Sequence, residues 1–244
     1  VQCYPMITGE PIGESSVYDP VLFWKNRDPR FKSSVAYNSS VWELSGKTGR
    51  KQWTYVGAQG DYTTQTGFYC RKAIDTNLTP AQSQYSSTDW VEIRYAEIML
   101  NYAECAAEWG KTDVAYPILK AIRERAGINA GDNGMYGLKA GMSRDEMIDA
   151  IMLERRIELA FEGKRYWDLR RRRLFKKELN GKIREGMRAN FAEGMNAEKL
   201  LEIQHTADFE NDYAQYFKDE LFDTDRKYTI DYQDNYYFFG IPNK

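Results

Sequence analysis

The sequence lacks any long apolar run, and its 244 residues include only three cysteines and one histidine. A membrane-spanning helix needs about 18 or more apolar residues in a row, and no stretch approaches that length. Cys3, Cys70 and Cys105 lie far apart, whereas structural zinc sites use paired spacings such as C-x-x-C. An odd cysteine count also argues against a disulfide framework. These absences exclude a helical membrane span, a zinc module and a disulfide-stapled scaffold.

Two of the cysteines have informative surroundings. Cys105 falls inside an apolar helical pattern, which predicts a buried small hydrophobic residue. Cys3 invites comparison with a lipid-bearing cysteine, but no apolar lipobox-like stretch precedes it. The chain also opens without the basic and apolar regions of a signal peptide. If the protein is exported, we therefore expect that segment to have been removed.

The motifs of hydrolases and nucleotide-binding proteins are also missing. His205 is the only histidine and has no recognisable nucleophile context, which argues against a histidine-based hydrolase. Neither a Walker loop nor G-x-G-x-x-G is present. Lys and Arg number 34 against 36 Asp and Glu, so the formal net charge of -2 gives no reason to expect a nucleic-acid partner. The sequence thus predicts no catalytic residues, no cofactor, no metal site and no nucleic acid.

Aromatic residues are abundant, with 18 Tyr, 11 Phe and 6 Trp making up 14% of the chain. Many lie in residues 1–90, a segment without a long helical period that is rich in Gly, Ser and Thr. A sugar ring has an apolar face that stacks on aromatic side chains, and its hydroxyl groups need polar partners. The same aromatic residues could instead anchor a long loop to a helical body. On the first interpretation, five of them are candidate ligand-binding residues: Trp42, Trp53, Tyr55, Tyr62 and Tyr69.

From Ile93 onward the apolar residues follow a helical period. They predict one helix over Ile93–Trp109, with Gly110 just beyond its end in a positive-φ conformation. Thr112 is expected to cap a second helix that ends at Gly127. Ile93 to Ala126 spans 34 residues, the length of a tetratricopeptide repeat.

A third helix begins after a Gly-rich loop, where Ser143 and Glu146 form a capping box. Its expected buried stripe contains Ala150, Leu153, Ile157, Ala160 and Phe161. The helix is expected to run to Gly163 or to continue to Leu174.

The remaining residues give weaker patterns. We expect short strands at Gln52–Val56, Gly67–Cys70, Tyr228–Ile230 and Tyr236–Phe239. We expect helices within Met195–Glu202 and Asp212–Leu221.

The densest charge pattern lies in the third helix. Glu154, Glu158 and Glu162 are four residues apart, and Arg155 and Arg165 each lie three residues from one of them, which predicts ion pairs within the helix. Two neighbouring carboxylates could also be the acid and base of a glycosidase. A general acid, however, needs a raised pKa, and an arginine within one turn has the opposite effect. A structural network is therefore favoured, and the arginine run 170–173 is interpreted as a solvated helix end.

Several strings, taken in order, resemble the SusD/RagB family. The helical signature is similar to WVEIRYAEIMLNYAECAAEWGKTDVAYPILKAIRERAGI at 90–128, and the next signature to ERRIELAFEGKRYWDLRRRRLF at 154–175. NRDPRF at Asn26–Phe31 and FYCRKAID at Phe68–Asp75 resemble upstream motifs. The terminal YYFFGIPNK resembles the closing aromatic strand of the family and its Ile-Pro dipeptide.

The resemblance implies a mainly α fold, a tetratricopeptide-like helical body with loop-rich, short-strand elaborations. Residues 1–90 would be the aromatic loop segment packed on that body, 91–175 the helices, and 176–244 a mixed segment of one SusD-like domain. The chain would then correspond to the C-terminal portion of the family, without the N-terminal half that carries the lipid anchor.

The resemblance also implies a function. Such a protein is no enzyme. It binds oligosaccharides at the outer-membrane surface of Bacteroidetes and passes them to a TonB-dependent, SusC-like transporter. Its membrane attachment would come only from the lipid anchor. A peptide-binding branch of the family, a helical-repeat scaffold that binds another protein, and a glycoside hydrolase using Glu154, Glu158 or Glu162 stay open as alternatives.

Overall fold

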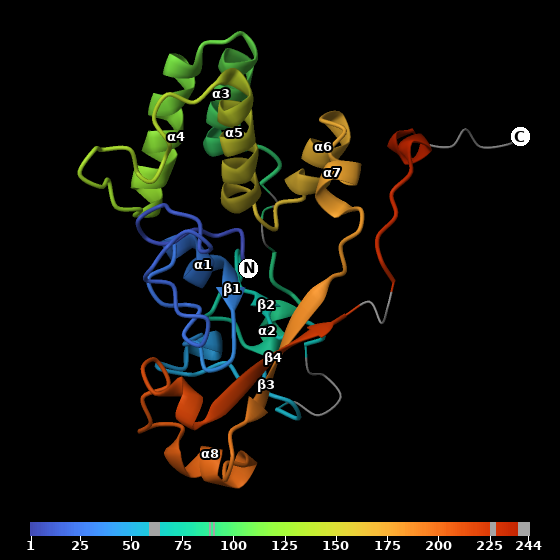
Figure 1. Ribbon diagram of the computed structural model, residues 1–244. Helices are drawn as coiled ribbons and strands as arrows, with labels where there is room; N and C mark the ends of the chain where they lie inside the picture. Colours follow the sequence, from blue (N-terminus) through green and yellow to red (C-terminus); the bar gives the residue numbers. More distant parts are fainter. Residues whose placement is uncertain (59–63, 88, 90, 225–227, 239–244) are drawn as a thin grey trace, which may run out of the picture.

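The computed structural model describes residues 1–58, 64–87, 89, 91–224 and 228–238. Its fold is mainly α with short strands and long loops, as predicted (Figure 1). The helices are α1 Pro29–Ser34, α2 Pro80–Ser83, α3 Tyr95–Glu108, α4 Thr112–Ala126, α5 Arg144–Glu158, α6 Lys164–Arg171, α7 Phe175–Leu179 and α8 Ala197–Ile203. The strands are β1 Val35–Ala36, β2 Tyr69–Cys70, β3 Glu185–Phe191 and β4 Phe217–Asp223. Short 3-10 helices occur at Leu44–Gly46, Tyr213–Gln215 and Asp234–Tyr237.

The helices α3, α4 and α5 form a body at one end of the molecule (Figure 1). Gly110 and Gly127 have φ values of 73° and 86° and end α3 and α4 in the left-handed conformation, as predicted. The Ser143–Glu146 capping box is present at the start of α5. The predicted cap at Thr112 is wrong, because Thr112 is the first helical residue and Lys111 precedes it without a side-chain hydrogen bond.

An aliphatic core fills the space between these three helices. Its members come from α3 to α5 and the loop between α4 and α5: Leu100, Ala103, Ala107, Ala115, Leu119, Ile122, Leu138, Met142, Met147, Ile148, Ile151, Met152 and Leu159. The alanines of α3 leave room for the neighbouring helices to approach closely.

The predicted buried stripe of α5 is wrong in part. Leu153 and Phe161 are 37% and 57% exposed, and the buried face instead carries Met147, Ile151 and charged residues. The expected helix end at Gly163 or Leu174 is also wrong, because α5 ends at Glu158. Phe161 and Gly163 then adopt φ values of 64° and 74° and turn the chain into α6. The apolar stripe predicts the wrong buried face of α5, because the face that is buried carries three charged residues: Glu154, Arg155 and Glu158.

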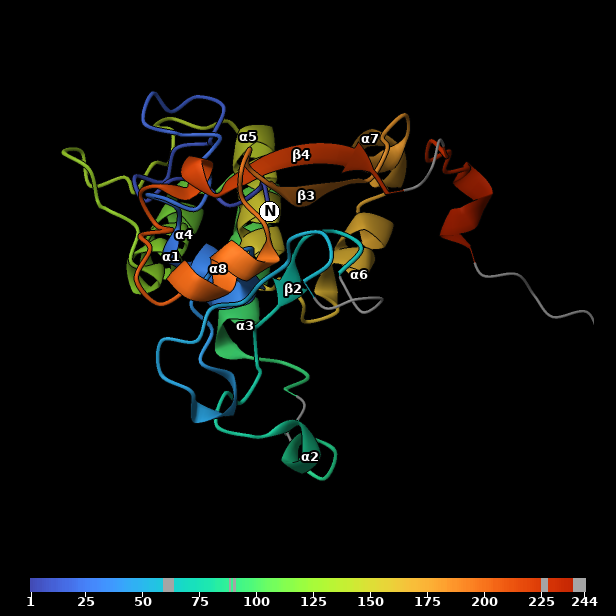
Figure 2. The ribbon, with the colours of Figure 1, turned by 90° about the horizontal axis from the view of Figure 1, so that it is seen from below.

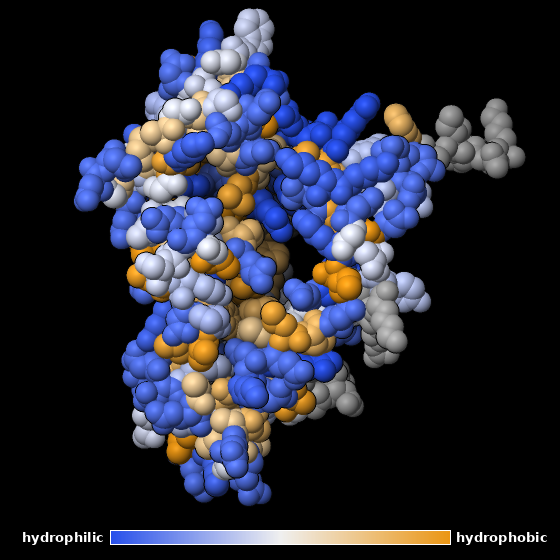
Figure 3. All heavy atoms as spheres, viewed as in Figure 1, coloured by the Kyte–Doolittle hydropathy of each residue, from blue (hydrophilic) through white to orange (hydrophobic). Residues whose placement is uncertain are grey.

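A second, aromatic core lies below the helical body in Figure 1, beside α1 and the β3–β4 hairpin. Its rings come from segments far apart in the chain: Tyr4, Phe23, Trp24, Phe31, Tyr37, Phe209, Tyr213 and Phe217, with Val35, Ile157, Ala189 and Leu200. The Trp24 ring stacks on Tyr37 with centroids 5.0 Å apart and meets the Tyr213 ring at 4.9 Å. Figure 3 shows the molecule from the same side as Figure 1. Hydrophobic residues gather along the middle of this side, and its outer edges are mainly hydrophilic.

The strands pair over long sequence distances. In β1 and β2, Val35 and Ala36 pair with Cys70 and Tyr69, so the strand predicted at Gly67–Cys70 is confirmed in its second half. The antiparallel β3–β4 hairpin runs toward α7 in both ribbon views (Figures 1 and 2). The sequence patterns do not predict it. Its second strand and a short 3-10 helix replace the helix expected at Asp212–Leu221.

The other expectations for short elements have mixed outcomes. Residues 197–203 form α8, which confirms the helix expected near Met195–Glu202. Residues 52–56 and 228–230 are not strands, and the 3-10 helix Asp234–Tyr237 replaces the start of the strand expected at Tyr236–Phe239. Phe239 lies outside the described residues. No helix within the described residues is long and apolar enough to cross a membrane.

A network of buried charges joins the two cores. Arg30 of α1 donates to Glu154 Oε1 at 2.6 Å and to Glu158 Oε2 at 2.9 Å, both on α5. Arg123 donates to Glu154 Oε2 at 2.8 Å, and Arg94 donates to Glu158 Oε1 at 2.7 Å. A structural network was predicted here, but the predicted pairs within the helix do not form: Arg155 contacts Asp168 instead, and Glu162 contacts Lys72 and Arg94. The arginines come from other elements because only those can reach a carboxylate on the buried face of α5.

Candidate functional site

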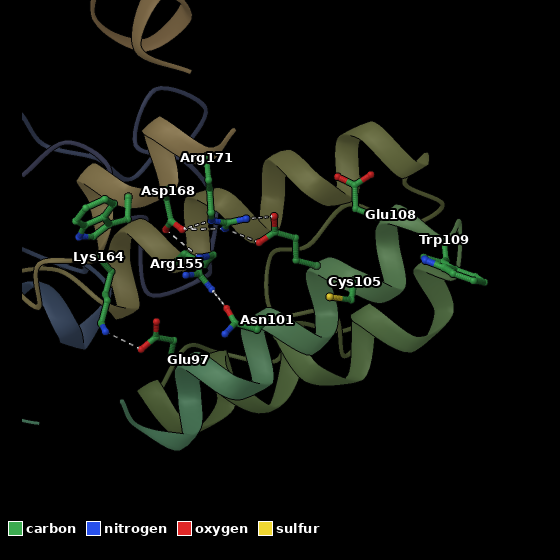
Figure 4. Close-up of a pocket in the computed structure, with 11 residues that line it drawn as sticks. Glu97, Asn101, Cys105, Glu108, Trp109, Arg155, Lys164, Asp168 and Arg171 are labelled. Atoms are coloured by element: carbon green, nitrogen blue, oxygen red, sulfur yellow. Dashed lines mark hydrogen bonds and ion pairs between the residues drawn. The ribbon is translucent and has the colours of Figure 1, made fainter. Parts of the chain in front are cut away.

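A cleft of about 510 Å³ lies between α3 and α6 (Figure 4). We call it the first cleft. Its wall on α3 consists of Glu97, Asn101, Glu104, Cys105 and Glu108, which share one face because they recur at intervals of three or four residues. The prediction that Cys105 is buried is wrong. Cys105 is exposed and lies on the face of α3 that lines this cleft, not on the face that packs in the aliphatic core.

The opposite wall comes from α6. Lys164, Trp167, Asp168 and Arg171 follow the same spacing of three or four residues and line the first cleft. Gly163 directs the start of this helix, since its φ of 74° reverses the chain after α5. The cleft exists because this reversal sets α6 beside α3 instead of extending α5.

Fixed ion pairs form the floor of the first cleft. Arg155 of α5 donates to Asp168 Oδ2 at 2.9 Å and to Asn101 Oδ1 at 2.6 Å, between the two walls (Figure 4). Arg171 donates to both oxygens of Glu104, at 2.5 and 2.6 Å, and to Asp168 Oδ1 at 2.8 Å. These hydrogen bonds, above all those to Glu104, raise the pKa of Arg171 above its ordinary value. The floor is therefore a rigid array of paired charges.

Two exposed indoles line the first cleft. Trp109, the residue that caps the C-terminus of α3, is 83% exposed, and Trp167 on α6 is 55% exposed. Trp109 marks one end of the first cleft, while the Lys164–Glu97 ion pair, with its atoms 3.1 Å apart, marks the other (Figure 4). Asn101 Nδ2 donates to none of the described residues. The arrangement offers aromatic faces, free N–H donors and ionised groups to a polar ligand with apolar faces.

Three carboxyl groups of the cleft and the network, those of Glu158, Glu162 and Glu108, have lowered pKa values. Burial alone would raise the pKa of Glu158, but hydrogen bonds from Arg94 and Arg30 outweigh it and lower the pKa to about 2. Burial is likewise outweighed at Glu162, where Arg94 and Lys72 lower the pKa. The hydrogen bond from Arg172 lowers the pKa of Glu108 at the cleft. A glycosidase acid requires the opposite shift, so these groups do not fit that role.

The candidate ligand residues predicted from the sequence lie elsewhere. Trp42 is only 7% exposed, and the Arg71 guanidinium lies 5.8 Å from its ring centroid. Trp53 and Tyr55 are brought together, with ring centroids 6.3 Å apart, and both pack against the aromatic core through Phe217. Burial raises the pKa of Tyr55.

The two remaining candidates are placed differently. Tyr69 is half-buried on β2, and Tyr62 lies outside the described residues. The structure thus brings only Trp53 and Tyr55 into contact among the described candidates. Their role as ligand residues stays a prediction.

The sequence interpretation missed the aromatic residues of the first cleft. Trp109 and Trp167 belong to the strings that resemble the family's helical signatures, and neither lies in a predicted apolar stripe. Asn101 gave no such signal, because its partner Arg155 lies 54 residues away in the chain.

The chain combines a helical body, an aromatic core and an open polar cleft between two helices. The chain belongs to the SusD family, whose family model matches residues 1–244. A SusD-like protein of Formosa agariphila is 38% identical over 152 residues, covering 62% of this chain and 29% of the relative.

Solved structures agree with this assignment. A SusD-like protein from Bacteroides fragilis matches with a TM-score of 0.62 and 26% identity, covering 77% of this chain and 37% of the other. A SusD-like carbohydrate binding protein from Bacteroides fragilis matches with a TM-score of 0.55 and 28% identity, covering 73% and 35%. The chain thus spans about a third of the length of these proteins.

Proposed function

We propose that this chain binds an oligosaccharide nutrient in the first cleft and does not cleave it. The observation that carries the proposal is the presence of two exposed indoles, Trp109 and Trp167, in the lining of a cleft that also contains fixed ion pairs. A sugar ring can stack on an indole, while its hydroxyl groups bond to Asn101 and to charged side chains. A SusD-like relative described as carbohydrate binding supports the same ligand class.

The biological setting follows from the family. Membership in the SusD family supports nutrient binding as a class of function. We further propose that the whole protein acts at the outer-membrane surface of a Bacteroidetes cell, attached through a lipid anchor. There it would deliver its ligand to a TonB-dependent, SusC-like transporter.

Calorimetry of the 244-residue chain against a panel of oligosaccharides tests the proposal, together with an assay for released reducing sugar. We expect binding of at least one oligosaccharide and no release. Failure to bind any glycan, with binding of a peptide, would move the assignment to the peptide-binding alternative. Release of reducing sugar that Glu158→Gln abolishes would establish a hydrolase.

The aromatic loop could supply a second contact region. Tyr69 on β2 and the Trp53–Tyr55 pair are only partly buried, so we retain them, with Trp42 and Tyr62, as proposed ligand residues. Tyr69→Ala tests this region. A loss of glycan affinity at unchanged melting temperature would include the loop in the site, and an unchanged affinity would remove it.

A specific observation also favours the scaffold alternative. The side chains of Tyr95, Ile98, Tyr102 and Trp109 form an exposed apolar stripe on α3, spaced by three, four and seven residues. This is the spacing by which helices pack side by side, and repeats of this type cover such faces by stacking. The partner would be a helix pair of another protein that packs on this stripe. Loss of partner binding in Tyr102→Asp, with no glycan bound by the parent chain, would favour the scaffold.

A further inference from the structure

The charged side chains that line the first cleft are paired with one another or with a direct neighbour (Figure 4). The pairs, each joined by a nitrogen–oxygen distance of 3.1 Å or less, are Lys164–Glu97, Arg171–Glu104, Arg171–Asp168, Arg155–Asp168 and Arg172–Glu108. These pairs include every carboxylate and every cation of the lining. The charges of the cleft are therefore compensated before any ligand arrives.

The two arginines of the lining have their donors in use. Arg155 is buried, and its Nε and Nη1 donate to Asp168 and to Asn101. The Arg171 side chain is 42% exposed, but its Nε and both of its Nη atoms donate to Asp168 or Glu104. An anionic ligand would have to displace a carboxylate that already holds the guanidinium.

The same holds at the two ends of the first cleft. Besides its pair with a carboxylate, Lys164 Nζ donates to the Glu92 carbonyl oxygen at 2.5 Å. At the other end, Glu108 is the most exposed carboxylate of the lining, with a side chain 29% exposed, and it is held by both Arg172 and Arg144. A cationic ligand would therefore meet carboxylates that are already paired.

Exposed neutral side chains make up the rest of the lining. They are Asn101, Cys105, Trp109 and Trp167. Arg155 donates to the Asn101 amide oxygen, which fixes the orientation of the amide and leaves its Nδ2 as a donor. Among the described residues neither indole N–H has an acceptor. Neutral N–H donors and aromatic faces are therefore the groups that remain available to a ligand.

We propose that the first cleft selects uncharged oligosaccharides and discriminates against acidic and basic ones. This inference rests on the proposed glycan binding in the same cleft. A ligand carboxylate, sulfate or ammonium group would lose its water there without finding an unpaired counter-charge, which is unfavourable. A hydroxyl group can accept from a neutral N–H and donate to a carboxylate that is already paired. Asn101 Nδ2 then donates to an oxygen of the sugar, whose apolar face stacks on an indole.

Calorimetry at low salt with matched pairs of probes tests the inference. The pairs are tetragalacturonate and its methyl ester, a carrageenan oligosaccharide and its desulfated form, and a chitosan tetramer and its fully N-acetylated form. In each pair that binds, we expect the neutral member to bind about tenfold more tightly than the charged one. The tightest ligand of the wider oligosaccharide panel should likewise be uncharged.

A substitution that breaks one pair tests whether the pairing causes the selection. Glu97→Gln removes the carboxylate that lies 3.1 Å from Lys164 Nζ, and the cation keeps only the Glu92 carboxylate at 3.8 Å. The variant should bind the acidic probes about tenfold more tightly than the parent chain does, at unchanged affinity for the neutral ones. Glu210→Gln is the matched control, because it makes the same change in net charge at an exposed pair with Lys32, outside the cleft. The control should leave all affinities as they are.

The outcomes separate this inference from the function on which it rests. A charged probe that binds the parent chain as tightly as its neutral partner, or more tightly, would overturn the selection for uncharged ligands and leave glycan binding intact. A preference that is unchanged in Glu97→Gln would overturn its assignment to the paired charges of this cleft. Binding of none of these probes or of any other glycan would overturn the proposed function itself.

Discussion

The two hydrophobic cores of this molecule are built in different ways. The first is aliphatic and comes from consecutive elements, residues 100–159, so that neighbours in sequence are also neighbours in space. The second is aromatic and collects rings from Tyr4 to Phe217. The first relies on helix periodicity, and the second on edge and stacking contacts between distant segments. The two cores are connected by a network of buried charges, Glu154 and Glu158 with Arg30, Arg94 and Arg123, which we call the joint.

The largest expected effect comes from breaking the joint. In Glu154→Gln a single amide oxygen replaces two carboxylate oxygens, which accept from Arg30 and Arg123. One guanidinium then faces an N–H donor inside the protein, so we expect a loss of about 3–5 kcal/mol in the free energy of unfolding. Urea denaturation measures it. Glu210→Gln, which breaks the exposed pair with Lys32, is the control and should cost less than about 1 kcal/mol.

In the helical body, the loss of unfolding free energy should depend on whether the substituted side chain faces the aliphatic core or the solvent. Leu100→Ala removes a fully buried side chain from α3 and should cost about 2–5 kcal/mol. Leu153→Ala on the outward side of α5 should cost less than about 1 kcal/mol. Equal losses in thermal or urea denaturation would show that the face of α5 is assigned wrongly.

Acid should weaken the joint as well. Because the pKa of Glu158 is lowered from 4.5 to about 2 on folding, its contribution to stability is complete above about pH 4.5. That contribution is lost as the pH falls toward 2, and it amounts to roughly 3 kcal/mol. Unfolding free energies measured from pH 6 down to pH 2 check this expectation. The decrease should be smaller in Glu158→Gln, and an identical decrease would contradict the assignment.

The smallest effect concerns the turn after α4. Gly127 has a φ of 86°, and an added Cβ would lie 3.3 Å from Pro29 Cγ. Gly127→Ala should therefore cost about 1 kcal/mol or more. Gly13→Ala is the matched control, since Gly13 has no positive φ and nothing lies within 4 Å of an added Cβ. A melting temperature that falls equally in both variants would remove this role from Gly127.

The difference between local contacts in the aliphatic core and long-range contacts in the aromatic core explains how much of the fold could be predicted. The α3–α4 hairpin and the capping box of α5 follow from local patterns, so the sequence predicted them. The β3–β4 hairpin depends on pairing such as Phe191 with Phe217, which leaves no short-range signal. Buried Glu154 and Glu158 made the true face of α5 look polar, and this displaced the predicted stripe.

The candidate site was less predictable than the fold. Aromatic residues in a polar loop suggested ligand contact, but Trp42, Trp53 and Tyr55 have packing partners that the sequence could not show. The first cleft arises from the turn at Gly163, which sets α6 beside α3. Its Trp109 and Trp167 belong to strings that identify the family, so their exposure became visible only in three dimensions.

Calorimetry of Trp167→Ala with a glycan that the parent chain binds tests the central claim most directly. Trp167 lines the first cleft and is exposed, so its removal should weaken binding about tenfold or more without lowering the melting temperature. Tyr102→Ser is the control, an exposed aromatic residue of α3 outside the cleft, and should leave the affinity unchanged. Equal affinities for the parent chain and Trp167→Ala would contradict glycan binding at this site.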